Sequence, residues 1–178
     1  MRRREFISLL GGAAAAWPLA ARAQQPSMPV VGFLHPSSPE PFGHIVDGFR
    51  RGLKDAGFVE GQNLAIEYRW ARGDYERLPT LAADLAQGHV RVILAGGGEA
   101  GALAAKAATS TIPILVITSS DPVKSGLVAS FNRPGGNVTG LMTATSVLEA
   151  KKFGLLCEMV PNARIVAMII NPNYPPHA

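Results

Sequence analysis

Three short segments hold the groups of this sequence that are best suited to contact a ligand. Their residues are Ser37 and Ser38 in the first segment, Gly97, Gly98 and Glu99 in the second, and Ser119, Ser120 and Asp121 in the third. Hydroxyl and backbone N–H groups can hold a polar ligand, and glycines let it approach the backbone closely. The carboxylate of Asp121 could pair with an ammonium group. These residue types indicate non-covalent binding of a small polar solute, although serines and aspartates at such places also cap turns and helices.

The glycine-rich segment also fits a dinucleotide-binding pattern. Gly96, Gly98 and Gly101 match G-x-G-x-x-G between an apolar run and a helical pattern, and Asp121 follows 20 residues later, where a ribose-binding acid would stand. This pattern would make the protein an exported oxidoreductase with a nicotinamide or flavin cofactor. Two features oppose it: Glu99 would lie close to the pyrophosphate, and the unit is the third along the chain rather than the first. The enzyme is therefore the alternative hypothesis, and the leading one needs no cofactor.

Motifs of other enzyme classes are missing from the sequence. It contains no G-x-S-x-G, H-E-x-x-H or P-loop lysine motif. The four histidines, His35, His44, His89 and His177, show no spacing typical of metal ligands. We therefore predict no catalytic residue and no metal site, whereas His35, at the end of an apolar run, could contact a ligand.

Alternating strand and helix patterns must position the three segments. Apolar runs typical of buried parallel strands cover 28–34, 90–95 and 112–118, and apolar residues that alternate with others predict a further strand over 64–70. Helical spacing of apolar residues between these runs predicts helices over 42–53, 78–85 and 100–108. The fold class is therefore α/β, with a Rossmann-like parallel sheet and helices on both faces. All three segments then follow strands, at the carboxyl edge where such sheets bind ligands.

Two further patterns stand near the end of the chain. Ser146 and Glu149 form a capping box that opens another helix, in which Cys157, the single cysteine, is expected to be a small core residue. A fifth apolar run covers 164–170, and we expect it to join the edge of the sheet or to leave an apolar surface exposed.

The first 23 residues have the layout of an export signal. Three arginines precede an apolar run over 6–19, and Ala21 and Ala23 supply the small residues that precede cleavage. The run is too short to span a bilayer, which takes about 20 residues. The segment 3–7 (RREFI) resembles a twin-arginine signal, with an ordinary Sec signal as the alternative. We therefore predict cleavage after Ala23 and a periplasmic location.

The basic charge of the sequence belongs mainly to this signal. The whole chain carries 17 basic and 13 acidic residues, a formal charge of +4. Cleavage removes four arginines and Glu5, which leaves 13 basic and 12 acidic residues and a charge of +1. Because the remaining basic residues are scattered, we expect no nucleic-acid partner.

Several segments resemble the ABC-transporter substrate-binding proteins of the tryptophan/tyrosine-uptake type. They are 58–64 (FVEGQNL), 66–71 (IEYRWA), 73–79 (GDYERLP), 104–114 (AAKAATSTIPI), 121–123 (DPV), 126–130 (GLVAS) and 133–140 (RPGGNVTG), the last two being the most specific. The resemblance spans about 29–172 and implies a periplasmic-binding-protein type I fold, in which two Rossmann-like lobes close on a ligand. It also implies an amino-acid-like or polar organic solute, an inner-membrane permease as partner, a monomer, and no catalysis. By position, it assigns the family's ligand-contacting loops to the same three segments.

The resemblance has one departure and one consequence for domain organisation. Where the family often has Thr or Ser followed by Pro, this chain has Glu99 and Ala100, and a carboxylate there would repel a ligand carboxylate. We expect a ligand-binding lobe over 24–145, a hinge near 136–145 and the incomplete start of a second lobe over 146–178. The family is nearly twice as long, which predicts a truncated chain. A third hypothesis is that the chain is a ligand-sensing module of a regulator, and the export signal argues against it.

Overall fold

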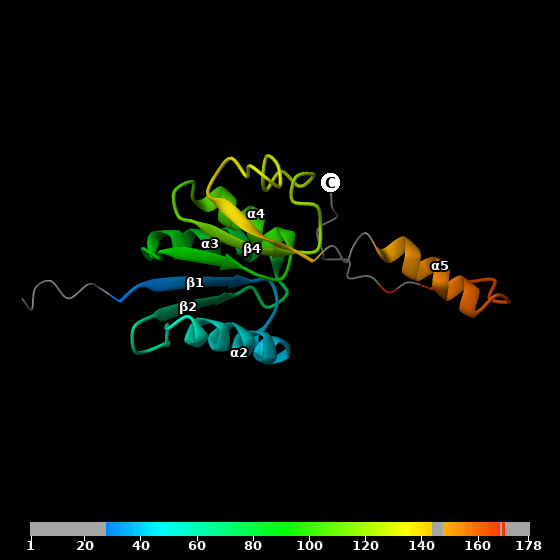
Figure 1. The fold of residues 1–178 in the computed structure, drawn as a ribbon, viewed down its shortest axis with the longest axis horizontal. Helices are drawn as coiled ribbons and strands as arrows, with labels where there is room; N and C mark the ends of the chain where they lie inside the picture. Colours follow the sequence, from blue (N-terminus) through cyan, green and yellow to red (C-terminus); the bar gives the residue numbers. More distant parts are fainter. Residues whose placement is uncertain (1–27, 144–147, 168, 170–178) are drawn as a thin grey trace, which may run out of the picture.

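The computed structural model describes residues 28–143, 148–167 and 169 (Figure 1). The predicted export signal and Ser146 of the capping box lie outside the described residues. The elements below are therefore those of the described residues.

Five parallel strands form a single sheet in the described part of the chain. They are β1 (Val30–His35), β2 (Ala65–Trp70), β3 (Val92–Ala95), β4 (Ile114–Thr118) and β5 (Val138–Met142). Their order across the sheet is β2-β1-β3-β4-β5, and every neighbouring pair is parallel. The predicted parallel sheet is confirmed, and four of the five strands lie on segments that the sequence predicts as strands.

Helices connect the first four strands as the sequence predicts, and a further helix follows β5. They are α2 (Pro39–Asp55), α3 (Leu78–Gln87), which follows a short 3-10 helix η1 (Tyr75–Arg77), α4 (Glu99–Ala108) and α5 (Glu149–Met159). Proline in its first turn starts α2, because that position needs no N–H donor, and Gly57, with a positive φ of 86°, follows its end. The predicted spans agree with α2, α3 and α4 to within a few residues.

The core has two layers, one on each face of the sheet. On one face, α3 and α4 cover fully buried side chains such as Leu34, Ile93 and Ile114. On the other face, α2 packs on Phe33 and Leu94. Alternate residues of each strand therefore point to opposite layers, as a two-sided α/β sheet requires. In Figure 1 the sheet lies between α2 below and α3 and α4 above.

The fifth strand is not the one that the sequence predicts. Residues 164–167 and 169 form no strand, and Ile165 and Ile169 are 88% and 100% exposed. The edge position belongs to β5, which pairs with β4 from Ile114↔Val138 onward. Asn137 fixes its start, because its Nδ2 donates to two carbonyl oxygens of the α4–β4 connection at 3.0 and 2.8 Å. The start of this strand is therefore held by side-chain hydrogen bonds of Asn137 and is not marked by a continuous apolar run.

Helix α5 contributes nothing to the described core. All of its residues are exposed, and in Figure 1 it stands apart from the sheet. Cys157, expected in the core, is an exposed free cysteine, because the apolar side of α5 packs on no buried layer of the described residues. None of the described helices is both long and apolar enough to cross a lipid bilayer.

Candidate binding groove

A groove of about 460 Å³ lies between α2 and the carboxyl ends of β1, β3 and β4. Its apolar wall and floor come from α2 and from the sheet face beneath it, through Phe42, Ile45, Phe49 and Ile117. Polar groups line its rim, where the β3–α4 and β4–β5 connections begin. The volume lies within the range of about 300–1,000 Å³ that is typical of small-molecule sites. An apolar groove with a polar rim can hold an amphipathic small molecule.

His35 is the titratable side chain that lines this groove. Its ring centroid lies 4.3 Å from that of Phe42 and 5.1 Å from that of Trp70, and it stacks on Phe33 at 6.0 Å. Burial among these rings lowers the pKa of His35 from its ordinary value of 6.5 to about 4. The imidazole is therefore neutral at pH 7, with one ring nitrogen protonated and the other able to accept a hydrogen bond.

The β3–α4 loop approaches His35 closely because it consists of glycine. Gly97 has a positive φ of 75°, and a Cβ built on it would lie 2.6 Å from Pro36 Cδ and 2.7 Å from His35 Nε2. Gly98 follows with a φ of 104°. These two positions therefore need glycine for backbone conformation, and Gly97 needs it also for space.

The structure brings together part of the predicted binding set. Gly97, Gly98 and Ser119 line the groove. Five other predicted residues lie outside its lining, namely Ser37, Ser38, Glu99, Ser120 and Asp121.

Local structure explains where several of these five residues lie. Asp121 holds a turn, since its Oδ1 accepts hydrogen bonds from Val123 N and Lys124 N at 2.9 and 3.3 Å. Ser38 occupies the N-cap position of α2, and Glu99 is only 9% exposed in the first turn of α4. Glu99 does not line the groove, but it directly follows Gly98, which does, so the repulsion expected between Glu99 and a ligand carboxylate stays a prediction.

Sequence reasoning did not assign the apolar wall of the groove to a ligand. Phe42, Ile45 and Phe49 lie on the face of α2 that their helical spacing predicts to be buried, and that spacing does not separate a core face from a groove wall. In the structure Ile45 is 46% exposed, which distinguishes it from a core residue. Among the described residues, no group of three or more His, Cys, Asp or Glu side chains could hold a metal ion.

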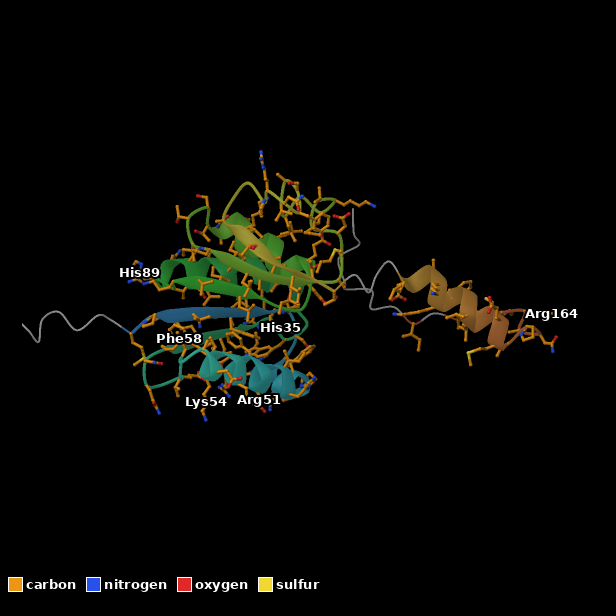
Figure 2. All side chains as sticks on the ribbon, viewed as in Figure 1. His35, Arg51, Lys54, Phe58, His89 and Arg164 are labelled. Carbon is orange, nitrogen blue, oxygen red and sulfur yellow. The ribbon has the colours of Figure 1, made fainter. Side chains whose placement is uncertain are left out.

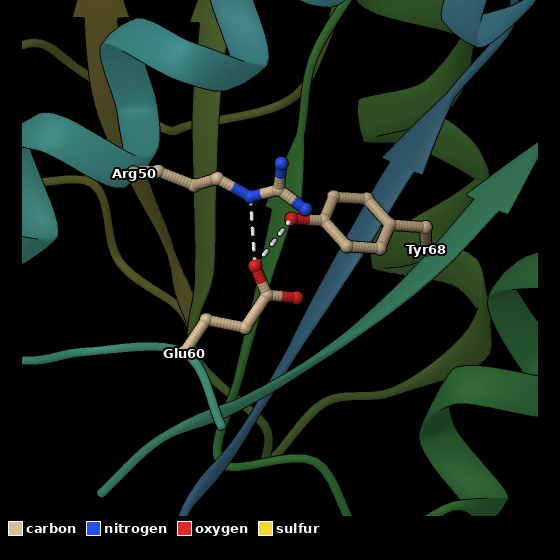
Figure 3. A network of polar contacts seen from close by, with 3 residues as sticks. All are labelled: Arg50, Glu60 and Tyr68. Atoms are coloured by element: carbon tan, nitrogen blue, oxygen red, sulfur yellow. Dashed lines mark hydrogen bonds and ion pairs between the residues drawn. The ribbon is translucent and has the colours of Figure 1, made fainter. Parts of the chain in front are cut away.

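An ion pair helps to hold α2, and so the groove wall, against the sheet. Arg50 Nε of α2 lies 2.7 Å from Glu60 Oε2, and the hydroxyl group of Tyr68 on β2 donates to the same oxygen at 3.4 Å (Figure 3). The Arg50 guanidinium also stands 5.5 Å from the centre of the Tyr68 ring. Burial, together with the Glu60 charge, raises the pKa of Tyr68 above its ordinary value. These contacts join α2, the α2–β2 connection and β2.

Residues 31–176 match the family model described as ABC transporter substrate binding protein. The chain belongs to this family. A tyrosine-binding protein of Clostridioides difficile is 33% identical over 124 residues, which are 70% of this chain and 35% of that protein. A conserved domain protein of Vibrio cholerae has a similar structure, with a TM-score of 0.68 and 29% identity over 76% of this chain and 45% of that one.

A third relative carries a ligand in its solved structure. It is an ABC domain in complex with L-Trp from Streptococcus pneumonia, with a TM-score of 0.59 and 26% identity over 65% of this chain and 39% of that one. This chain therefore spans less than half the length of the relatives it matches. The expected periplasmic-binding-protein type I fold is confirmed by these neighbours. The oxidoreductase alternative finds no support among them, and the carboxylate that would bind ribose, Asp121, holds a turn.

Proposed function

We propose that this chain provides the ligand-binding surface of an exported solute-binding protein that serves an ABC-type uptake transporter. The groove beside α2 is the observation that carries the proposal, because it combines an apolar wall, a polar rim and a position at the carboxyl edge of a parallel sheet. Gly97, Gly98 and Ser119 supply its polar side. The protein binds and releases its solute without chemical change.

The solute we propose is an amino acid or a related polar organic molecule with an aromatic or large apolar group. The groove favours such a solute, since Phe42 and Phe49 can pack against a ring while the glycine loop faces polar groups. The names of two relatives, a tyrosine-binding protein and a domain in complex with L-Trp, agree with this choice.

The wider setting follows from the family and from the sequence. We propose that residues 1–23 direct export, through the twin-arginine or the Sec pathway, and that the mature protein is a periplasmic monomer that delivers solute to an inner-membrane permease. Residues 24–145 would form the ligand-binding lobe, and 146–178 the start of a second lobe. Because β5 is paired with β4 as far as Met142, the hinge would begin after that residue.

The test is a titration that detects weak binding, since a groove open on one side buries only part of a solute. Two-dimensional NMR spectra of the ¹⁵N-labelled chain would be recorded with L-tyrosine, L-tryptophan, L-leucine, L-glutamate or NAD⁺. We expect L-tyrosine or L-tryptophan to shift signals of the glycine loop and α2. Shifts with NAD⁺ and with no amino acid would overturn the proposal.

Two exposed apolar residues give a matched pair of variants for this titration. Ile45 lines the groove and is 46% exposed, whereas Phe58 is 44% exposed and does not line it. Figure 2 labels Phe58 at the opposite end of the sheet from His35. Ile45→Asp should weaken binding by about tenfold or more, a loss of about 1.4 kcal/mol, and Phe58→Asp should leave it unchanged. Equal effects of the two variants would place the solute elsewhere.

A further inference from the structure

We propose that His35 is a specificity-determining residue of the groove, whose Nε2–H donates a hydrogen bond to an oxygen acceptor of the bound solute. This inference rests on the proposed function and names one chemical requirement of the solute. It assigns a role to a side chain that the three predicted segments do not include.

The hydrogen bond at the other ring nitrogen fixes the tautomer of His35. The backbone N–H of Ser37 donates to Nδ1 at 3.1 Å, so Nδ1 carries no proton. Burial among aromatic rings disfavours the charged form of the imidazole, whose pKa is about 4. A neutral imidazole holds one proton, and here it must be on Nε2. The bond to Ser37 thus makes Nε2 a donor.

The position of Nε2 makes that donor available to a solute. Nε2 faces Gly97, where a Cβ would lie only 2.7 Å away, and Gly97 is exposed at the rim of the groove. The missing side chain therefore leaves Nε2 uncovered on this side. In the described part of the chain, the bond at Nδ1 is the hydrogen bond that the structure gives this ring. Among the described residues, Nε2 is not one of the buried side-chain atoms that lack a hydrogen-bond partner, so it is open to solvent. A solute that covers Nε2 without an acceptor would leave it buried and unpaired, which is costly, so a solute that supplies an acceptor gains affinity over one that does not.

The chemistry of this donor selects among solutes. A neutral N–H can bind a carboxylate, carbonyl or hydroxyl oxygen, and it cannot bind an ammonium group, which has donors only. The rings of Phe42 and Trp70 surround the imidazole and hold its orientation. We therefore expect the bound solute to direct an oxygen atom at Nε2 while its apolar part lies along α2.

The first measurement is the NMR spectrum of the imidazole nitrogens. The chain would be labelled with ¹⁵N-histidine, and long-range ¹H–¹⁵N correlations would be recorded at pH 7 before and after addition of L-tyrosine or L-tryptophan. We expect His35 to show the Nε2–H tautomer, and its Nε2 signal to move with added solute. His89 is an exposed reference at the opposite end of the sheet (Figure 2), and its signals should not move.

The second measurement compares two substitutions of the same residue. His35→Phe keeps a ring and removes the donor, and we expect it to weaken solute binding about fivefold, the value of one ordinary hydrogen bond. His35→Gln keeps an amide donor and should recover part of that affinity. A purely structural role would make the variant that keeps the ring bind better than His35→Gln.

The outcomes separate this inference from the proposed function. Solute binding at the groove without a shift of Nε2, or a His35 ring protonated on Nδ1, would overturn the role of His35 and leave the proposed function standing. Failure of every amino acid to shift any signal of the chain would overturn the proposed function, and the inference with it. The tautomer and titration results do not depend on the folding of a variant.

Discussion

Replacing Gly97 by Ala should destabilise the protein more than replacing another glycine with the same backbone conformation. Gly97 has a φ of 75°, and Gly57, after the end of α2, has a φ of 86°. Nothing lies within 4 Å of a Cβ built on Gly57. A Cβ on Gly97 would lie 2.6 and 2.8 Å from two carbons of Pro36 and 2.7 Å from His35 Nε2. The two positions therefore share the conformational cost and differ in the steric one.

The magnitudes follow from these two terms. A left-handed backbone costs a residue with a Cβ about 1–2 kcal/mol, which is the effect expected of Gly57→Ala. Forcing an extra methyl group against packed atoms adds about 1–3 kcal/mol. The Pro36 ring is rigid, so the loop or the imidazole must move to relieve the contact. Gly97→Ala should therefore lose about 1–3 kcal/mol more than Gly57→Ala, and it should displace His35.

Urea denaturation followed by far-UV circular dichroism measures this difference. With an m-value of about 2 kcal/mol per molar urea, the additional loss lowers the midpoint by about 0.5–1.5 M relative to Gly57→Ala. The His35 imidazole signals should shift in Gly97→Ala and stay in place in Gly57→Ala. Equal midpoints for the two variants would contradict the steric cost that we assign to a Cβ at Gly97 against Pro36 and His35.

Four other predictions use the same denaturation assay. Ile114→Ala should cost about 3 kcal/mol because Ile114 is fully buried, whereas Leu115→Ala, at a position 41% exposed, should cost about 1 kcal/mol; equal losses would contradict the assigned faces of β4. Asn137→Ala removes both hydrogen bonds to the α4–β4 connection and should cost about 1–3 kcal/mol. Asp121→Ala should cost about 1 kcal/mol through its turn and leave solute affinity unchanged, so a loss of binding would return Asp121 to the site. Because the folded-state pKa of His35 is about 4 and its ordinary value is 6.5, the unfolded chain binds more protons between these values, and stability should fall as pH decreases through that window; His35→Phe should reduce the difference in urea midpoint between pH 7 and pH 5.

The sequence predicts the parallel sheet because most of its strands are continuous apolar runs. Such runs fit strands that helices cover, and the helical spacing between them fixes the order of elements. The edge strand β5 is not predicted by these patterns, since Thr139 and Gly140 interrupt its apolar residues. What places β5 is the side chain of Asn137, which contacts residues 25 and 28 positions earlier in the chain. Contacts of that separation are not visible as a local pattern.

The groove was predicted only in part, for a different physical reason. Loops that follow parallel strands can be assigned to the carboxyl edge from topology, and that argument includes Gly97, Gly98 and Ser119, which line the groove. It does not tell which polar group in such a loop faces a solute and which one holds its own turn. Asp121 holds its own turn, because two nearby backbone N–H groups donate hydrogen bonds to its carboxylate oxygen.

In the described part of the chain, α2 covers only part of one face of the sheet, and both the groove and the exposed apolar residues of the sheet lie on that face. The continuous apolar run of β4 predicts burial on both sides, and Ile114 and Val116 are indeed buried beneath α4. On the opposite side Leu115 and Ile117 are 41% and 42% exposed, and Leu141 of β5 is 63% exposed. Ile117 also lines the groove, so this exposed strip continues into its floor. Among the described residues, α2 packs over Phe33 and Leu94 and not over this strip, so Leu115 and Ile117, which the sequence predicts to be buried, are exposed instead.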